Sequence, residues 1–197
     1  KNYHNYLSIG DQKRLKITRQ YFKKKKLVLI DRDGTLNKKI HNKRYITSVN
    51  EIELNMSIIN ILKKFKNLKF LCITNQAGVS TKDLTKFELI KINSKLRDML
   101  RKNGIKILKY FISTDHYLSN SFNRKPNPGL FLEASKKYKF LLDQTIYIGD
   151  DKRDIAASYN ASTKCFFLGK KNNKLKNSNF VLKGSLSENL KLLNDKK

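Results

Sequence analysis

The sequence predicts an α/β protein with a doubly wound, mostly parallel sheet and no large cap domain. Short apolar runs alternate with amphipathic segments along residues 26–197, the pattern of parallel strands joined by helical crossovers. The first run, 27–30, ends abruptly at Asp31 and Asp33. Open α/β sheets bind ligands at the carboxyl ends of buried strands, so this acidic turn indicates a ligand site. A chain of 197 residues is long enough for one such domain.

Most strands are predicted from short apolar runs that end in polar or glycine residues, and the strand at 107–113 is predicted from alternating side chains. Runs of this length fit strands better than helices, and a run without a polar break indicates a strand buried on both faces. We expect strands at 27–30, 70–73, 107–113, 145–149 and 164–168, with a short sixth strand at 180–182.

Helices are predicted between the strands from apolar spacing and from capping residues. Thr85 and Glu88 form a capping box, and Pro128 suits the first turn of another helix. Asp11 and Ser185 are the expected caps of the first and last helices. The predicted helical segments lie within 11–22, 55–68, 85–104, 128–139, 154–159 and 185–194.

The loops leave little room for an inserted cap domain. Residues 38–54 are polar, lack a helical period and suit a flap or short hairpin over the end of the first strand. Residues 80–112 are accounted for by one helix and one strand. We therefore expect an open site, shaped by this flap and by the loop 114–127.

The chain is strongly basic, with a formal net charge of +27 from 43 Lys and Arg against 16 Asp and Glu. A basic surface can bind nucleic acid by releasing counterions from phosphates. Here the lysines are dispersed along the chain and no basic segment is interleaved with aromatic residues, so solvated lysine faces are the simpler explanation. We expect no nucleic-acid partner and keep one as an alternative.

The apolar segments and the cysteines bear on location. No stretch approaches the ~20 apolar residues of a membrane span, and we expect no membrane partner. Cys72 and Cys165 both lie inside apolar runs, where free thiols in a reducing compartment are the simplest interpretation. These features predict a cytoplasmic protein.

Four loops at the predicted strand ends carry chemically distinct side chains. Carboxylates follow the first and fourth strands, a hydroxyl and two amides follow the second, and two cations lie in the loop after the third. Carboxylates that face a lysine need a cation and an anion between them, and Mg²⁺ with a phosphoryl group meets that need. Each motif alone is common in turns and caps, so specificity comes from their order. The residues are Asp31, Asp33, Thr74, Asn75, Gln76, Arg124, Lys125, Asp150 and Asp154.

This order of motifs resembles the haloacid dehalogenase superfamily of phosphohydrolases, from about residue 26 to the end. Four segments are similar to a narrower group, the D-glycero-D-manno-heptose 1,7-bisphosphate 7-phosphatases and the histidinol-phosphate phosphatase domains. These segments are 31–37, Tyr45, 74–79 and 124–129. Asn37 and Tyr45 favour the heptose branch.

The resemblance implies a role for each principal residue. Asp31 would be the nucleophile that takes up the phosphoryl group, and Asp33 the general acid and base. Mg²⁺ would be bound by the Asp31 carboxylate, the Asp33 backbone carbonyl and Asp150. Thr74 and Lys125 would hold the phosphoryl oxygens.

The remaining residues are expected around these. Arg124, Asn75 and Gln76 would contact the substrate, and Asp154 would support the metal loop or Lys125 from behind. The implied activity is Mg²⁺-dependent hydrolysis of a sugar phosphate through an aspartyl phosphate. D-glycero-D-manno-heptose 1,7-bisphosphate, a precursor in lipopolysaccharide synthesis, is the expected substrate.

Two departures from the family pattern concern the rim of the site. Many relatives bind zinc in the loop before Arg124 through three cysteines and a histidine. Residues 114–123 contain no cysteine, and His116 alone cannot form a tetrahedral site. We expect no zinc and a loop that is ordered in another way or mobile. Residues 80–82, Ser-Thr-Lys, replace an arginine common in the family.

Three alternatives stay open. A polynucleotide 3′-phosphatase shares much of this motif set and would make use of the charge. Histidinol phosphate is a second possible substrate. A non-catalytic module that accompanies a nucleotidyltransferase is the third, although retention of Asp31, Asp33, Lys125 and Asp150 argues against it.

Residues 1–24 are expected to be an extension that precedes a phosphatase domain of residues 25–197. Residues 6–22 resemble the closing segment of sugar-phosphate nucleotidyltransferases, in which a short strand ending in Ile-Gly precedes a final helix. The sequence begins at Lys1, so we expect a piece of a longer chain or a processed product. The resemblance implies fusion to a sugar nucleotidyltransferase, and we expect a monomer.

Overall fold

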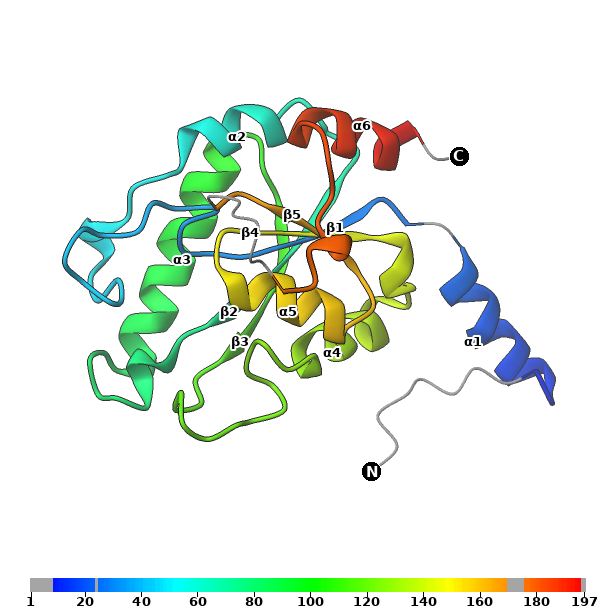
Figure 1. Cartoon of the computed structure of the whole chain (residues 1–197), viewed down its shortest axis with the longest axis horizontal. Coiled ribbons are helices and arrows are strands. Elements are labelled where there is room, and N and C mark those ends of the chain that lie inside the picture. Colours follow the sequence, from blue (N-terminus) through cyan, green and yellow to red (C-terminus); the bar gives the residue numbers. More distant parts are fainter. Residues whose placement is uncertain (1–8, 24, 170–175, 196–197) are drawn as a thin grey trace.

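The computed structural model describes residues 9–23, 25–169 and 176–195. Its strands form one parallel sheet in the order β3-β2-β1-β4-β5 (Figure 1). The first strand lies at the centre and the chain winds outward on both sides, which confirms the predicted doubly wound sheet. The strands are β1 Leu27–Ile30, β2 Lys69–Asn75, β3 Ile107–Ser113, β4 Ile146–Gly149 and β5 Lys164–Phe167.

Helices cover both faces of the sheet. Because strand side chains alternate between faces, Val28 and Ile30 pack in one apolar cluster with α2, α3 and α6, whereas Leu27 and Leu29 pack in another with α4 and α5. Figure 1 shows these two groups of helices on opposite sides of the sheet. The helices are α1 Gln12–Phe22, α2 Met56–Leu62, α3 Lys86–Lys102, α4 Gly129–Tyr138, α5 Lys152–Asn160 and α6 Leu186–Asp195.

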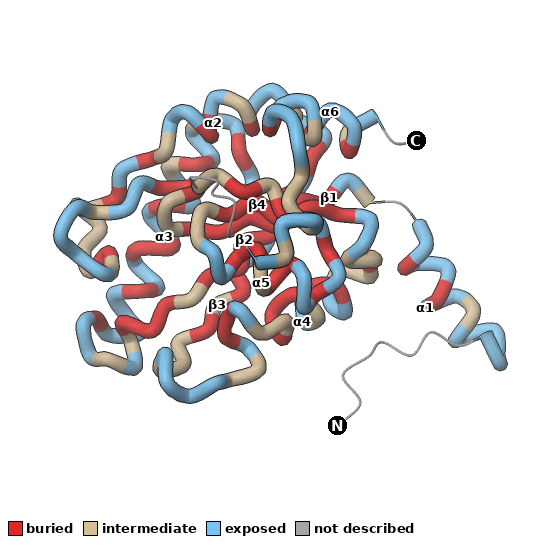
Figure 2. Tube along the Cα trace, viewed as in Figure 1, coloured by how far each residue is buried: buried red, intermediate tan, exposed pale blue. Residues whose placement is uncertain are grey.

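The strands are the most deeply buried part of the chain (Figure 2). Every residue of β1 and β4 is buried, since each strand has helices on both sides. Ile30 lies opposite Cys72 of β2 on one side and Ile148 of β4 on the other. From this level β4 continues to Gly149 and β2 to Asn75. All three strands run in the same direction, so the loops that follow them lie at the same edge of the sheet.

The predicted caps are in place. Asp11 accepts a hydrogen bond from the Arg14 N–H at the start of α1. Thr85 and Glu88 form the predicted capping box of α3. Ser185 and Glu188 bond in the same reciprocal way before α6.

Two elements differ from the prediction. The helix expected over 55–68 ends at Leu62, because the chain turns through tighter hydrogen bonds, including one from the Phe65 N–H to the Leu62 carbonyl. The sixth strand was predicted wrongly. Ser178–Phe180 is a 3₁₀ turn, and only Val181 forms a bridge to Cys165 of β5.

The predicted flap is short. Residues 38–54 contain one 3₁₀ turn, Val49–Glu51, and Leu54 is tied by an isolated bridge to Asn37. The segment 80–112 contains α3 and the start of β3, as predicted. The site at the strand ends is thus bordered by loops.

The N-terminal helix α1 projects from the side of the sheet (Figure 1). Its buried residues are Thr18 and Tyr21, and the Lys139 ammonium lies 5.5 Å from the centre of the Tyr21 ring. The short strand expected to end at Ile9 and Gly10 lies outside the described residues except for these two. No helix in the described ranges is long and apolar enough to cross a membrane.

Candidate active site

A cavity of about 470 Å³ opens at the carboxyl ends of β1, β2 and β4. Eight of the nine residues predicted from the sequence line it, together with flap residues that include Tyr45 and loop residues that include Tyr117. The ninth, Gln76, is fully buried behind the wall. The four loops predicted to meet do meet here.

Lys125 lies at the centre of the buried charges. Its ammonium donates hydrogen bonds to Asp31 at 2.8 Å, to Asp154 at 2.8 Å and to the Tyr147 hydroxyl at 2.7 Å. Only 4% of Lys125 is exposed. Burial opposes its charge, but the two carboxylates outweigh burial and raise the pKa of Lys125 above its ordinary value. Lys125 is therefore a fixed cation.

Asp31 continues the sheet directly from β1, because its N–H donates to the Ile148 carbonyl at 2.8 Å. Burial of the side chain raises the pKa of its carboxyl to about 7, although the charge of Lys125 opposes this rise. Full ionisation of Asp31 near neutral pH therefore calls for more positive charge beside it.

Asp33 is held by four hydrogen bonds, two to each carboxylate oxygen. Oδ1 accepts from Arg32 Nε at 3.0 Å and Asn37 Nδ2 at 2.9 Å, and Oδ2 accepts from Arg32 Nη2 at 2.9 Å and Gln76 Nε2 at 2.8 Å. Burial alone would raise the pKa of Asp33, but the charge of Arg32 and these bonds lower it. The structure thus favours the ionised form of Asp33.

The loop after β2 supports its neighbours. Gln76 Nε2 donates to Thr74 Oγ1 at 2.9 Å as well as to Asp33. The Asn75 side chain bonds the backbone of Lys125 twice, donating to its carbonyl at 2.9 Å and accepting from its N–H at 3.0 Å. Both side-chain amides therefore bond other protein groups. Asn75 fixes the loop segment that carries Lys125.

Three carboxylates could hold a metal ion. Asp31, Asp150 and Asp154 each offer an oxygen atom, and these atoms lie within 4.8 Å of one another. Asp150 Oδ1 is buried without a hydrogen-bond partner, which a cation would satisfy. Asp154 is already occupied by Lys125, Tyr147 and the Asp151 N–H. Asp31 and Asp150 therefore fit a hard divalent cation best.

The turn after Asp31 lets Asp150 approach closely. Gly34 has φ +87°, and a Cβ there would lie 2.3 Å from Asp150 Oδ2. Only glycine satisfies both the backbone conformation and this contact. The flap also reaches the acidic cluster, because Lys39 forms an ion pair with Asp150.

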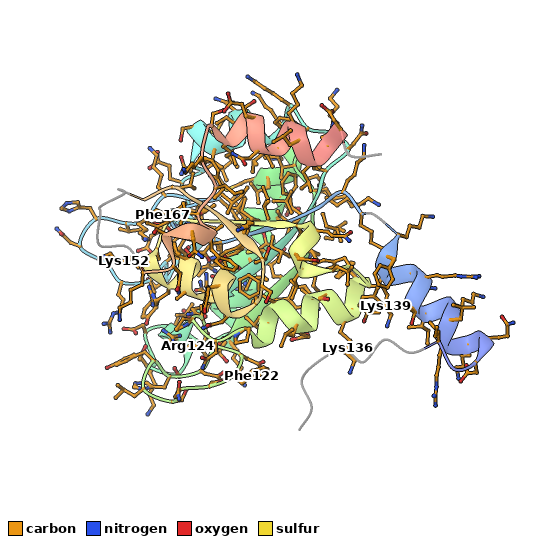
Figure 3. All side chains as sticks on the ribbon, turned by 45° about the vertical axis from the view of Figure 1, so that its right-hand side comes forward. Phe122, Arg124, Lys136, Lys139, Lys152 and Phe167 are labelled. Carbon is orange, nitrogen blue, oxygen red and sulfur yellow. The ribbon has the colours of Figure 1, made fainter. Side chains whose placement is uncertain are left out.

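The loop 114–127 is ordered by polar contacts. Asp115 Oδ2 accepts from Ser113 Oγ at 3.1 Å and Ser121 Oγ at 2.5 Å. Arg124 Nη1 donates to the Asp115 carbonyl at 3.2 Å. Figure 3 shows Arg124 and Phe122 near one another at the lower edge of the molecule. The predicted alternative to a zinc site is thus a network centred on Asp115.

Arg124 belongs to a cluster of cations at the mouth of the cavity. Burial lowers the pKa of its guanidinium, and the charges of Arg153 and Arg44 add to this effect. Arg44 lies 5.2 Å from the centre of the Tyr117 ring. This cationic rim suits an anionic substrate.

Two residues of the site were missed in the sequence analysis. Arg32 bonds Asp33 and also Asn93 of α3, and Tyr147 of β4 bonds Lys125. Tyr147 could not be told from a core residue of its strand. Asn93 could have indicated a buried polar partner such as Arg32. It is a polar residue among the buried apolar positions of α3, and a buried amide needs a hydrogen-bond partner.

Comparison with known proteins places the chain in a family. A family model described as polynucleotide kinase 3 phosphatase matches residues 26–180. The D-glycero-beta-D-manno-heptose-1,7-bisphosphate 7-phosphatase of Helicobacter pylori is 32% identical over 71% of this chain and 80% of its own length. The corresponding alpha-heptose phosphatase of Photorhabdus laumondii is 30% identical over 73% of this chain and 82% of its own length.

The fold has solved relatives. A D,D-heptose 1,7-bisphosphate phosphatase from B. bronchiseptica, crystallised with magnesium and phosphate, superposes with a TM-score of 0.67 at 22% identity. The match covers 72% of this chain and 79% of that one. The chain therefore belongs to the haloacid dehalogenase-like phosphatases, in the family that the polynucleotide kinase 3 phosphatase model describes.

Proposed function

We propose that the chain is a Mg²⁺-dependent phosphatase that removes the 7-phosphate of D-glycero-D-manno-heptose 1,7-bisphosphate in lipopolysaccharide precursor synthesis. The observation that carries the proposal is the pairing of Asp31 with the buried Lys125 at 2.8 Å, beside the unpartnered Asp150 Oδ1. This arrangement offers a nucleophile, a fixed cation and a metal ligand around one point. The names of the two heptose phosphatases support the substrate.

In the proposed first step, Asp31 attacks phosphorus and the bond from phosphorus to the sugar oxygen breaks. Asp33 must take up a proton for this step, although Arg32 and the other donors favour its ionised form. It gives that proton to the sugar oxygen, and the products are the sugar alcohol and an aspartyl phosphate. In the second step Asp33 takes a proton from water, the water oxygen attacks phosphorus, and inorganic phosphate leaves Asp31. Lys125 exchanges its hydrogen bond to Asp31 for one to a phosphoryl oxygen, and the Thr74 hydroxyl holds a second phosphoryl oxygen.

The metal site fits this reaction. Asp31, Asp150 and the Asp33 carbonyl would hold Mg²⁺, which would neutralise charge between the carboxylate and the phosphoryl group. Asp154 supports Lys125 from behind, through the 2.8 Å ion pair. Arg124, which lines the cavity, would contact the sugar. Asn75 and Gln76 would act through the residues that they bond.

A phosphate-release assay over a substrate panel tests the proposal. The panel contains the α and β anomers of heptose 1,7-bisphosphate, histidinol phosphate and a 3′-phosphorylated oligonucleotide, each with Mg²⁺. We expect the highest kcat/KM for a heptose bisphosphate. If histidinol phosphate were the only substrate with a high kcat/KM, the substrate assignment would change and the proposed mechanism would stand.

A polynucleotide 3′-phosphatase is the second candidate. The description of the matched family model and the net charge of +27 favour it, because a basic surface attracts a polyanion. Its signature would be oligonucleotide turnover that falls steeply with added salt. A small sugar phosphate should show a much weaker dependence.

We also propose the domain organisation predicted from the sequence, with residues 1–24 as the tail of a fused sugar nucleotidyltransferase and residues 25–197 as the phosphatase. A monomer in the cytoplasm fits this proposal, and the buried free thiols of Cys72 and Cys165 suit a reducing compartment. Light scattering of the purified chain tests the monomer. Activity of residues 25–197 alone tests the boundary.

A further inference from the structure

Arg32 is a fully buried arginine between the two aspartates of the first loop, with 0% of its surface exposed. A buried guanidinium is costly unless its N–H groups are bonded and its charge is paired. Arg32 meets both conditions by bonding three side chains, and its ion pair with Asp33 is 2.9 Å long. Because burial of a charged guanidinium costs free energy, its presence between Asp31 and Asp33 indicates that Arg32 has a role in the site.

The contact with Asp33 is a two-point fork. Nε donates to Oδ1 at 3.0 Å and Nη2 donates to Oδ2 at 2.9 Å. A fork of this kind fixes the plane of a carboxylate as well as its position. A lysine at the same place would supply charge without fixing the plane.

The fork is itself anchored from the opposite side. Asn93 Oδ1 on α3 accepts from Arg32 Nη1 at 2.9 Å, and Gln76 Oε1 accepts from Nη2 at 2.7 Å. The Arg32 carbonyl accepts the Leu36 N–H at 2.8 Å, which fixes its backbone. Side chain and backbone are thus both held, so the position of the Asp33 carboxylate depends on α3.

We propose that Arg32, anchored by Asn93, is a positioning residue that aims the Asp33 carboxylate into the cavity for proton transfer. The side chain of Asp33 lines the cavity and is 25% exposed, whereas Arg32 has no access to a substrate. This inference rests on the proposed function, because it assumes that Asp33 exchanges protons with the leaving group and with water.

Two substrates of nearly equal shape test it. Phenyl phosphate needs a proton on its leaving oxygen, and p-nitrophenyl phosphate needs little. In Arg32→Lys we expect kcat/KM to fall about 100-fold for phenyl phosphate and about threefold or less for p-nitrophenyl phosphate, since proton transfer contributes ~10²–10⁴-fold. We also expect a burst of p-nitrophenol, because the Asp33-dependent second step is slowed.

Arg97→Lys is the matched control. Arg97 lies on the exposed side of α3, over the Tyr110 ring at 5.4 Å, and we expect no change in the ratio of the two kcat/KM values. Equal losses on both substrates in a folded Arg32→Lys protein would overturn the proposal and leave Arg32 a purely structural residue.

Asn93→Ala keeps the test decisive if Arg32→Lys fails to fold. It removes the anchor without removing the charge, and we expect about a tenfold fall in kcat/KM for phenyl phosphate only. Asn103→Ala at the end of α3, where the side chain bonds the Met99 carbonyl, is its control. An unchanged substrate ratio in Asn93→Ala would also contradict the proposal. Failure of the proposed function would look different, as absence of a phosphoenzyme in the unaltered protein.

Discussion

Asp31 and Asp33 are two residues apart and have opposite environments. Burial raises the pKa of Asp31 to about 7, while Arg32 and two further hydrogen-bond partners, Asn37 and Gln76, outweigh burial and lower the pKa of Asp33. The proposed nucleophile must be ionised, so in the proposed mechanism the charge of Asp31 depends on Lys125 and on a cation held by Asp150. Environment, and not residue type, thus separates the two carboxylates.

Replacement of Lys125 by Met tests its part in this balance. The change leaves Asp31 and Asp154 as buried carboxylates without their shared cation, and breaking a buried pair typically costs about 3–5 kcal/mol. We expect loss of turnover and a lower melting temperature. Thermal unfolding and phosphate release measure these. Lys137→Met, which alters an exposed lysine of α4, should change neither by much, and near-normal turnover in Lys125→Met would contradict the assignment.

The loops around the cavity are ordered by side-chain networks and not by regular structure. Glu51 accepts the Thr47 N–H at 2.8 Å and the Ser48 N–H at 3.2 Å, and it pairs with Lys43. This closes the flap, just as Asp115 closes the loop 114–127. The residues of such networks lie close together in the sequence. The capping box that Ser48 and Glu51 form in the flap was therefore accessible to sequence analysis in principle.

Replacement of Glu51 by Gln should loosen the flap. The hydrogen bond from Lys43 and those from the backbone lower the pKa of the Glu51 carboxyl from 4.5 to about 2. A lowered folded-state pKa adds stability above the unfolded value, and this stability is lost as pH falls from about 4.5 towards 2. We expect Glu51→Gln to lower the melting temperature at pH 7 and to match the unaltered protein near pH 2. A difference that persists at low pH would exclude this cause.

Chelation of divalent metal ions should abolish activity without unfolding the protein. The loop 114–127 is held by Asp115, Ser113, Ser121 and Arg124, so removing divalent ions should abolish activity and leave circular dichroism unchanged. Added Mg²⁺ should restore the activity. Metal analysis should find no stoichiometric zinc, and about one zinc per chain would require ligands that residues 114–123 do not supply.

For the whole molecule, the sequence predicted more of the fold than of the contacts within the site. The apolar runs predicted the inner strands β1, β2 and β4, because strands covered on both faces are largely apolar. The edge strand β3 was predicted instead from alternation, and its Lys109 is exposed. The same reasoning was wrong at 180–182, where the residues are apolar but only Val181 pairs with the sheet. The anchoring of the Arg32–Asp33 fork by Asn93 could not be predicted from the sequence. Arg32 and Asn93 are 61 positions apart and meet only when α3 packs on the sheet.

Removal of residues 1–24 should leave the phosphatase intact. The described contacts of α1 with the remainder centre on Tyr21, whose burial contributes on the order of 1.5–3 kcal/mol. We expect residues 25–197 to fold, to unfold at a temperature a few degrees lower, and to keep kcat/KM. Loss of activity in this folded fragment would show that the extension belongs to the phosphatase.

The phosphoenzyme on Asp31 is the central claim, and acid-quenched mass spectrometry tests it most directly. The protein is mixed with Mg²⁺ and p-nitrophenyl phosphate, quenched within one turnover, digested and analysed for the peptide that contains residues 27–37. We predict that this peptide gains the mass of one phosphoryl group on Asp31, and that Asp31→Asn shows neither the adduct nor turnover. Turnover by Asp31→Asn at a near-normal rate, or an adduct on another residue, would contradict the account.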